Sequence, residues 1–157
     1  MADISRFNMA LVTPSREHAI SIIIGTNQLS QKHGMVLTEK DARQIINARD
    51  NALKTTGRIE TDLRVINEII RTFCQSPYIN QANYADMICQ LVEAFYHMKN
   101  ETREQIGDDD LIYTMRDYFD NRCFGSIELL TGRELEKLVD EIRFGRHYSL
   151  PDEREEV

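Results

Sequence analysis

The chain has 157 residues, of which 41% are apolar and 29% charged, and its formal net charge is −7. This length suffices for one globular domain with its own core, and the negative charge disfavours a nucleic-acid or anionic-membrane binder. No segment holds the roughly 20 apolar residues that a membrane-spanning helix needs. Three widely spaced cysteines without a CxxC pair are typical of free thiols in a reducing compartment. We therefore predict a soluble cytoplasmic protein that binds neither nucleic acid nor membrane.

Prolines and glycines stand where helices should begin or end, which predicts an all-α fold. Thr13-Pro14 predicts an N-cap and first helical position for a helix over about 14–31. Residues 37–42 combine a hydrophobic staple with a capping box, so a second helix should run from there to Gly57.

A third helix is predicted over about 60–74, where apolar residues recur at helical spacing on more than one side. These residues are Leu63, Val65, Ile66, Ile69, Ile70 and Phe73. Glu60, Arg64 and Glu68 lie four apart on the remaining face, which we interpret as i,i+4 pairing in solvent.

Three further helices are predicted in the second half of the chain. After a break at Ser76-Pro77, Asn80 is a suitable cap for a long amphipathic helix over 81–101. Carboxylates at 108–110 predict the start of the next helix, where they complement the helix dipole. A short helical turn over 126–130 then precedes a last helix, for which 131–134 (TGRE) has the pattern of a capping box.

Together these elements predict a compact bundle of about six helices as a single domain over 1–148, followed by a frayed acidic tail over 149–157. The charge is unevenly distributed along the chain. Residues 1–78 hold ten bases and eight acids, whereas residues 79–157 hold nine bases and eighteen acids. Such asymmetry can orient a partner or a head-to-tail contact between copies, or it can reflect more solvated helix surface.

Motifs for catalysis or cofactor binding are missing from the sequence. There is no phosphate loop, dinucleotide fingerprint, serine-hydrolase elbow or zinc pattern, so we predict no metal and no cofactor. Glu93, His97 and Glu101 share one helical face, but that face is opposite the apolar one and is interpreted as an exposed, salt-bridged ridge. Cys123 is the one cysteine with an adjacent arginine, and it is either an activated or a buried structural thiol.

The segment between the third and fourth predicted helices has an unusual composition. Tyrosines, amides and an extended Ser-Pro step occur together at one helix junction, which suits internal hydrogen bonding at a capped corner or a small recognition surface. The candidate ligand- or partner-binding residues are Ser76, Tyr78, Asn80, Asn83, Tyr84 and Cys123.

Several strings of residues are distinctive. They are GRIE over 57–60, FCQSPY over 73–78, NY over 83–84, FYHMKNE over 95–101 and CFGS over 123–126. With these strings the chain resembles, over most of its length, a family of small uncharacterised bacterial proteins, a domain of unknown function. The resemblance implies a bacterial cytoplasmic protein and supplies no activity, cofactor or catalytic residue.

Two functions remain open. The first is a non-enzymatic helical protein–protein interaction or accessory module, acting as a homo-oligomer or with a protein partner. The broad apolar stripe of the third helix and the charge asymmetry favour it. The second is a small-molecule-binding protein or enzyme with an interhelical site near residues 76–84.

Overall fold

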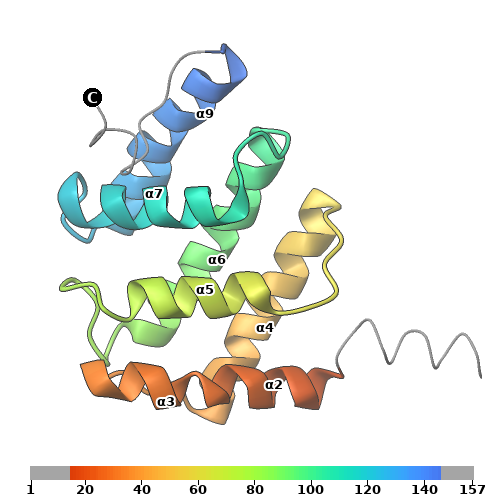
Figure 1. The fold of residues 1–157 in the computed structure, drawn as a ribbon, viewed down its shortest axis with the longest axis vertical. Helices are drawn as coiled ribbons and strands as arrows, with labels where there is room; N and C mark the ends of the chain where they lie inside the picture. Colours follow the sequence, from red (N-terminus) through yellow and green to blue (C-terminus); the bar gives the residue numbers. More distant parts are fainter. Residues whose placement is uncertain (1–14, 146–157) are drawn as a thin grey trace, which may run out of the picture.

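Residues 15–145 are described by a computed structural model, and every regular element in that range is helical (Figure 1). The elements are α2 (Arg16–Gly25), α3 (Asn27–Ser30), the 3₁₀ turn η1 (Gln31–His33), α4 (Glu39–Thr56), α5 (Arg64–Phe73), α6 (Tyr84–Glu101), α7 (Asp108–Asn121), α8 (Ile127–Leu129), the π-helical turn η2 (Leu130–Glu134) and α9 (Leu135–Arg143). Six of these helices have nine or more residues, which confirms the predicted all-α bundle. The predicted tail over 149–157 lies outside the described residues.

The helix starts in the first half follow from local side-chain capping. Thr38 and Asp41 each accept the other's backbone N–H, which forms the capping box predicted for α4. Helix α2 begins at Arg16, with Ser15 as its N-cap. The predicted cap at Thr13-Pro14 lies outside the described residues, and the helix start it implied is two residues too early.

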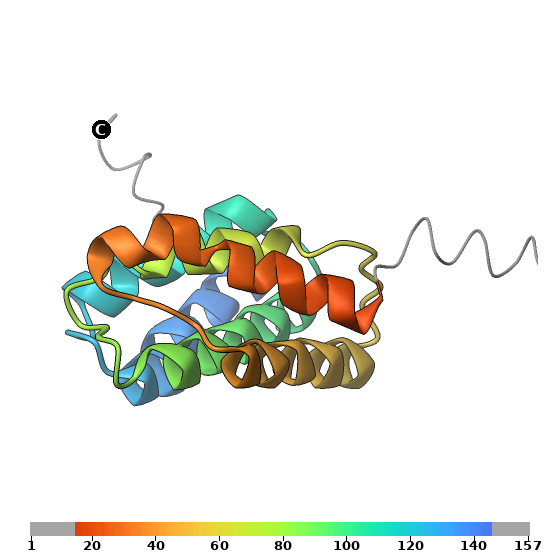
Figure 2. The ribbon, with the colours of Figure 1, turned by 90° about the horizontal axis from the view of Figure 1, so that it is seen from below.

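The helices are arranged in two crossing layers. Helices α2, α5 and α7 run side by side in one layer, and α4, α6 and α9 cross beneath them (Figures 1 and 2). Helix α6 is central, because it packs against α4, α5, α7, α8 and α9. Helix α6 therefore contacts helices that precede it in the chain and helices that follow it.

The predicted apolar faces are in the core. All six apolar residues predicted for the third helix are buried. The apolar face of α7 is buried as well, and so is that of α6, apart from the partly buried Met87. Each fully buried aliphatic or aromatic side chain stabilises the fold by about 1.5–3 kcal/mol. Burial of these faces explains why α5 forms although its N-cap residue, Leu63, makes no side-chain cap; the first N–H of the helix, that of Arg64, donates to Asp62.

The predicted capping box over 131–134 is wrong. The chain stays helical from α8 through η2 into α9, so no new helix start needs a cap. The Thr131 hydroxyl donates to the backbone carbonyl of Ile127, one turn earlier. Glu134 is buried and accepts hydrogen bonds from Arg122 and Arg133 instead of capping the backbone.

Candidate functional site

The corner that joins α5 to α6 lies beside the turn that joins α7 to α8, at one end of the bundle (Figures 1 and 2). Ser76 is buried, and its Oγ donates to Oδ1 of Asp120 at 2.7 Å. The Tyr78 ring packs edge-on against Phe119 with centroids 6.4 Å apart. The structure therefore brings two of the predicted site residues against α7.

The two predicted asparagines bind each other. The Asn80 N–H donates to Oδ1 of Asn83 at 2.9 Å, and the Asn83 N–H donates to Oδ1 of Asn80 at 3.1 Å. Helix α6 consequently begins at Tyr84, after a turn over 81–83, and the prediction that Asn80 caps a helix from residue 81 is wrong. These amides make the internal hydrogen bonds of a capped corner.

Tyr84 and Cys123 are core residues. Tyr84 has no exposed surface, and burial raises the pKa of its hydroxyl to about 12. The Cys123 thiol is 2% exposed, and burial raises its pKa despite the opposing effects of Arg133 and Arg122. The adjacent arginine therefore does not make Cys123 an activated nucleophile.

Two aromatic side chains are exposed at the corner. Phe124 is 68% exposed and has a left-handed backbone, with φ 49°, and Gly125 follows with φ 82°. A Cβ at Gly125 would lie within 3.0 Å of the Tyr78 side chain, so only glycine fits between the two segments. Tyr78, Phe124 and Gly125 together are named the aromatic corner.

Phe124 is the residue that the sequence interpretation missed, although it belongs to the CFGS string. A large apolar residue directly before a glycine, outside any helical periodicity, was the signal for an exposed ring. Helical spacing does not report on such a position, because the residue lies between α7 and α8.

A different cluster surrounds the other end of α6. The Lys99 side chain is 4% exposed, and its Nζ lies 2.9 Å from Asp108 and 3.3 Å from Glu104. Lys99 also donates to the backbone carbonyl of Ile106. Arg58 pairs with the same two carboxylates, at 3.0 Å and 3.1 Å. These charged residues hold the 102–107 loop against α6.

Glu60 is also part of this cluster, so the prediction that it lies on a solvated helix face is wrong. Its side chain is 8% exposed and lies between Arg49 at 3.5 Å and Arg58 at 3.2 Å. The Tyr96 hydroxyl donates to it at 2.6 Å. Because α5 begins only at Arg64, the four-residue spacing from Glu60 has no helical meaning, and Arg64 pairs with Asp109 instead.

The carboxylates at 108–110 begin α7 as predicted, but dipole complementarity is not their only role. Burial opposes ionisation of Asp108, and hydrogen bonds from Lys99 and Arg58 outweigh it, so that its pKa is lowered. Burial and the hydrogen bond to Glu60 raise the pKa of Tyr96. We name Arg49, Arg58, Glu60, Tyr96, Lys99, Glu104 and Asp108 the ion cluster.

A cavity of about 250 Å³ opens beside the ion cluster. Its lining residues are Thr56, Gly57, Arg58, Tyr96, Lys99, Asn100, Arg103 and Glu104. Three of these side chains are cationic and one is anionic, in a chain that is acidic overall. Arg58 and Lys99 are already paired with carboxylates, so Arg103 is the lining cation that remains open to an anion.

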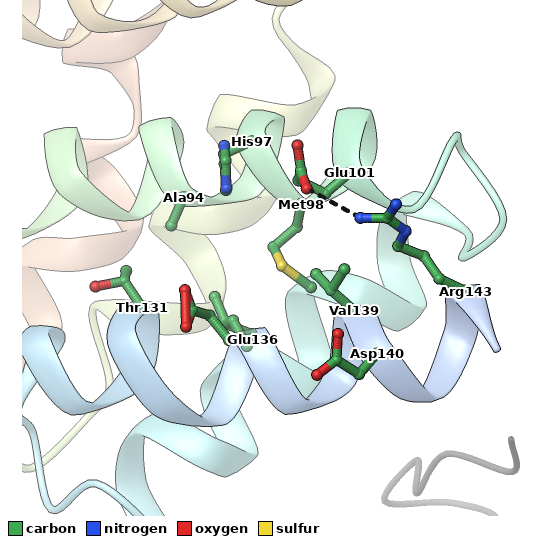
Figure 3. A pocket seen from close by; sticks show the side chains of 10 residues that line it. Ala94, His97, Met98, Glu101, Thr131, Glu136, Val139, Asp140 and Arg143 are labelled. Carbon is green, nitrogen blue, oxygen red and sulfur yellow. Dashed lines mark ion pairs between the residues drawn. The ribbon is translucent and has the colours of Figure 1, made fainter.

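A second cavity, of about 260 Å³, lies between α6 and α9 (Figure 3). Met98 and Val139 line its apolar side, and Glu101 of α6 pairs with Arg143 of α9 across it at 3.6 Å. His97 lines this cavity and is exposed, and Glu101 is half-buried. Glu93, one turn before His97 on α6, is also exposed but does not line the cavity. Within residues 15–145, no group of three or more His, Cys, Asp or Glu is placed to hold a metal ion.

A family model described as a family of unknown function (DUF6323) matches residues 22–148. The chain belongs to DUF6323. This finding confirms the resemblance to a domain of unknown function, and the matched range includes both the aromatic corner and the ion cluster. No curated protein and no solved structure matches the chain. In the part of this DUF6323 protein that the structure describes, no helix has the length and apolar character needed to cross a membrane.

Proposed function

We propose that this DUF6323 protein is a non-enzymatic protein-binding module and that the aromatic corner is its contact surface. The observation that supports this most is the exposed Phe124 ring on a left-handed backbone. That conformation costs about 1–2 kcal/mol for a residue with a Cβ, and a ring left in water returns little of this to folding. Strain without a folding benefit is expected where a side chain serves binding.

The aromatic corner is fixed before any partner arrives. The Gly125 N–H donates to the Phe119 carbonyl at 2.9 Å, and the Cys123 N–H donates to the Tyr118 carbonyl at 2.9 Å, so both sides of Phe124 are tied to α7. Tyr78 is held by Phe119 and by the close approach of Gly125. Rigid aromatic anchors of this kind lose little entropy on binding and dominate many interfaces.

The charges around the corner are mixed. Arg116 pairs with Asp120, and Arg122 shares the one carboxylate of Glu134 with Arg133 and Lys137. Glu128, exposed on α8, forms no ion pair with any described residue. We therefore propose that the partner is another protein, which presents an apolar side chain to the exposed rings. We also propose a cytoplasmic location, because all three cysteines are free thiols.

Binding is tested with Phe124→Gly, which removes the ring and relieves the backbone strain. A partner is first isolated from a lysate of the source organism, and its Kd for purified wild type and variants is measured by calorimetry. We expect Phe124→Gly to weaken binding by about tenfold or more while the melting temperature stays equal or rises. Ile59→Ser is the matched control, because Ile59 is 89% exposed and lies outside the corner.

The same series contains the results that would overturn the proposal. Equal Kd values for wild type and Phe124→Gly would remove the aromatic corner from the interface. Light scattering that shows a wild-type dimer and a Phe124→Gly monomer would make a second copy the occupant, and would contradict the proposed binding of a different protein. A melting temperature that falls sharply in Phe124→Gly would show that the ring serves folding.

A further inference from the structure

We propose that the cavity beside the ion cluster binds a small oxyanion, a carboxylate or a phosphate, and that the Glu104 carboxylate occupies the anion position until the ligand displaces it. This inference is independent of the proposed protein-binding function, because the cavity and the aromatic corner lie at opposite ends of α6. It gives this DUF6323 protein a small-molecule site.

The cations of the cavity are the first support. Arg58 is 18% exposed and Lys99 4% exposed, and buried cations need anionic partners. The Arg103 side chain, at the cavity surface, forms no ion pair or hydrogen bond with any described residue. Arg103 is therefore available to a ligand, whereas Arg58 and Lys99 already have anionic partners in the protein.

Glu104 is suited to be replaced. Its side chain is 52% exposed, yet its carboxylate accepts from Nη1 of Arg58 at 3.1 Å and 3.2 Å and lies 3.3 Å from Nζ of Lys99. It can leave into solvent, whereas Asp108 behind it remains on both cations. An incoming oxyanion would thus take the place of the Glu104 carboxylate, and no buried charge would be left unpaired.

The backbone at Glu104 supports the same conclusion. Arg103 and Glu104 both have left-handed backbones, with φ of 52° and 61°, in consecutive positions without glycine. Each such residue is held against a conformational cost of about 1–2 kcal/mol. The Glu104 N–H donates to the Lys99 carbonyl at 2.8 Å and holds this backbone, so a ligand has to displace only the carboxylate.

The cavity limits the size of the ligand. Its volume of about 250 Å³ lies below the 300–1,000 Å³ that is usual for drug-sized ligands. Arg58 lies over the rings of Phe95 and Tyr96, at 5.8 Å and 5.7 Å, which fixes its planar donors in place. A short di- or tricarboxylate or a phosphate therefore fits the site better than a nucleotide.

The test uses citrate and inorganic phosphate as probes, at constant ionic strength set with potassium chloride. Binding to the full chain is followed by amide chemical shifts near residues 56–58 and 99–104. We expect a saturable Kd of about 1 mM or below for at least one probe. Glu104→Gln should lower that Kd by about fivefold or more, and Arg103→Gln should raise it by a similar factor.

Glu93→Gln is the matched control for charge. Glu93 is an exposed acid on α6 outside this cavity, so its substitution changes the net charge equally and should leave the Kd unchanged within about twofold. Arg103→Gln removes no side-chain hydrogen bond or ion pair among the described residues, so this variant still tests the inference if Glu104→Gln is unstable. The relative Kd values of citrate and phosphate distinguish a carboxylate from a phosphate ligand.

Two results would overturn the inference. One is the absence of saturable shifts with either probe at about 10 mM in both wild type and Glu104→Gln. The other is an equal effect of Glu93→Gln and Glu104→Gln, since that would reduce the result to a general effect of net charge.

Discussion

The two ends of α6 are stabilised by different physical effects. At its first residue, Tyr84 is completely buried among apolar groups, and the corner before it is closed by neutral asparagine hydrogen bonds. Near its last turn, Lys99 is almost as deeply buried, but among carboxylates. Near neutral pH and at moderate salt, burial of apolar surface changes little with conditions, whereas paired charges depend on both salt and pH. The first end of α6 should therefore respond less to these conditions than the last turn.

This difference extends to the surfaces. The aromatic corner exposes apolar rings around a fixed backbone, which suits a flat protein contact. The ion cluster lies beside a charged cavity and holds the half-exposed carboxylate of Glu104, an arrangement that suits a small anion. The two proposals consequently use separate residues and can succeed or fail independently.

The largest expected effect is at the first end. Tyr84→Ala should lower the free energy of unfolding by about 3–5 kcal/mol, because it empties a fully buried aromatic position. Tyr84→Phe should change it by less than about 1 kcal/mol, because the hydroxyl has no hydrogen-bond partner among the described residues. Urea unfolding followed by circular dichroism measures both. A loss below about 1 kcal/mol for Tyr84→Ala would show that the ring is not part of the core.

Lys99→Met tests the other end and should have a smaller effect. Breaking a buried ion pair typically costs 3–5 kcal/mol, but Arg58 still pairs with Asp108 at 3.0 Å, so we expect about 2–3 kcal/mol. The matched control is Lys137→Met, whose side chain is 63% exposed and pairs with Glu134 at 3.7 Å. This control should stay within about 0.5 kcal/mol in the same urea unfolding. Equal losses for the two variants would contradict a special role of the buried lysine.

The first end was largely predictable from sequence and the second was not. Apolar spacing places Tyr84 on the core face of a helix, and amides around Ser-Pro indicate a corner, since both signals are local. The ion cluster joins residues from α4, the 57–63 segment, α6 and the 102–108 segment, and no local pattern records such long-range pairing.

Glu60 and Lys99 show why the long-range pairing was missed. Glu60 has helical spacing to Arg64, but the helix begins after it, so its partners lie on other elements. Lys99 lies between apolar positions of α6 and is buried because carboxylates from the next loop and α7 reach it. In both cases an opposite charge on another element allows the side chain to be buried. The sequence around the buried residue does not show that partner.

The smallest expected effect, and the one that distinguishes the two ends most directly, is the pH dependence of stability. The folded pKa of Asp108 is below its ordinary value of 3.8, so the ionised form stabilises the folded state. That contribution is fully present above about pH 4 and is lost as the pH falls through the lowered folded pKa. Asp108→Asn should flatten the acid limb of a plot of unfolding free energy against pH.

Asp110→Asn and Tyr84→Phe are the controls for this measurement. Asp110 belongs to the same first turn of α7, but it is exposed and forms no ion pair with any described residue. Tyr84→Phe alters the uncharged end of α6 and should keep the wild-type slope. If Asp110→Asn flattened the acid limb as much as Asp108→Asn, the effect would arise from the helix dipole that both carboxylates share, and the pairing with Lys99 and Arg58 would not be its cause.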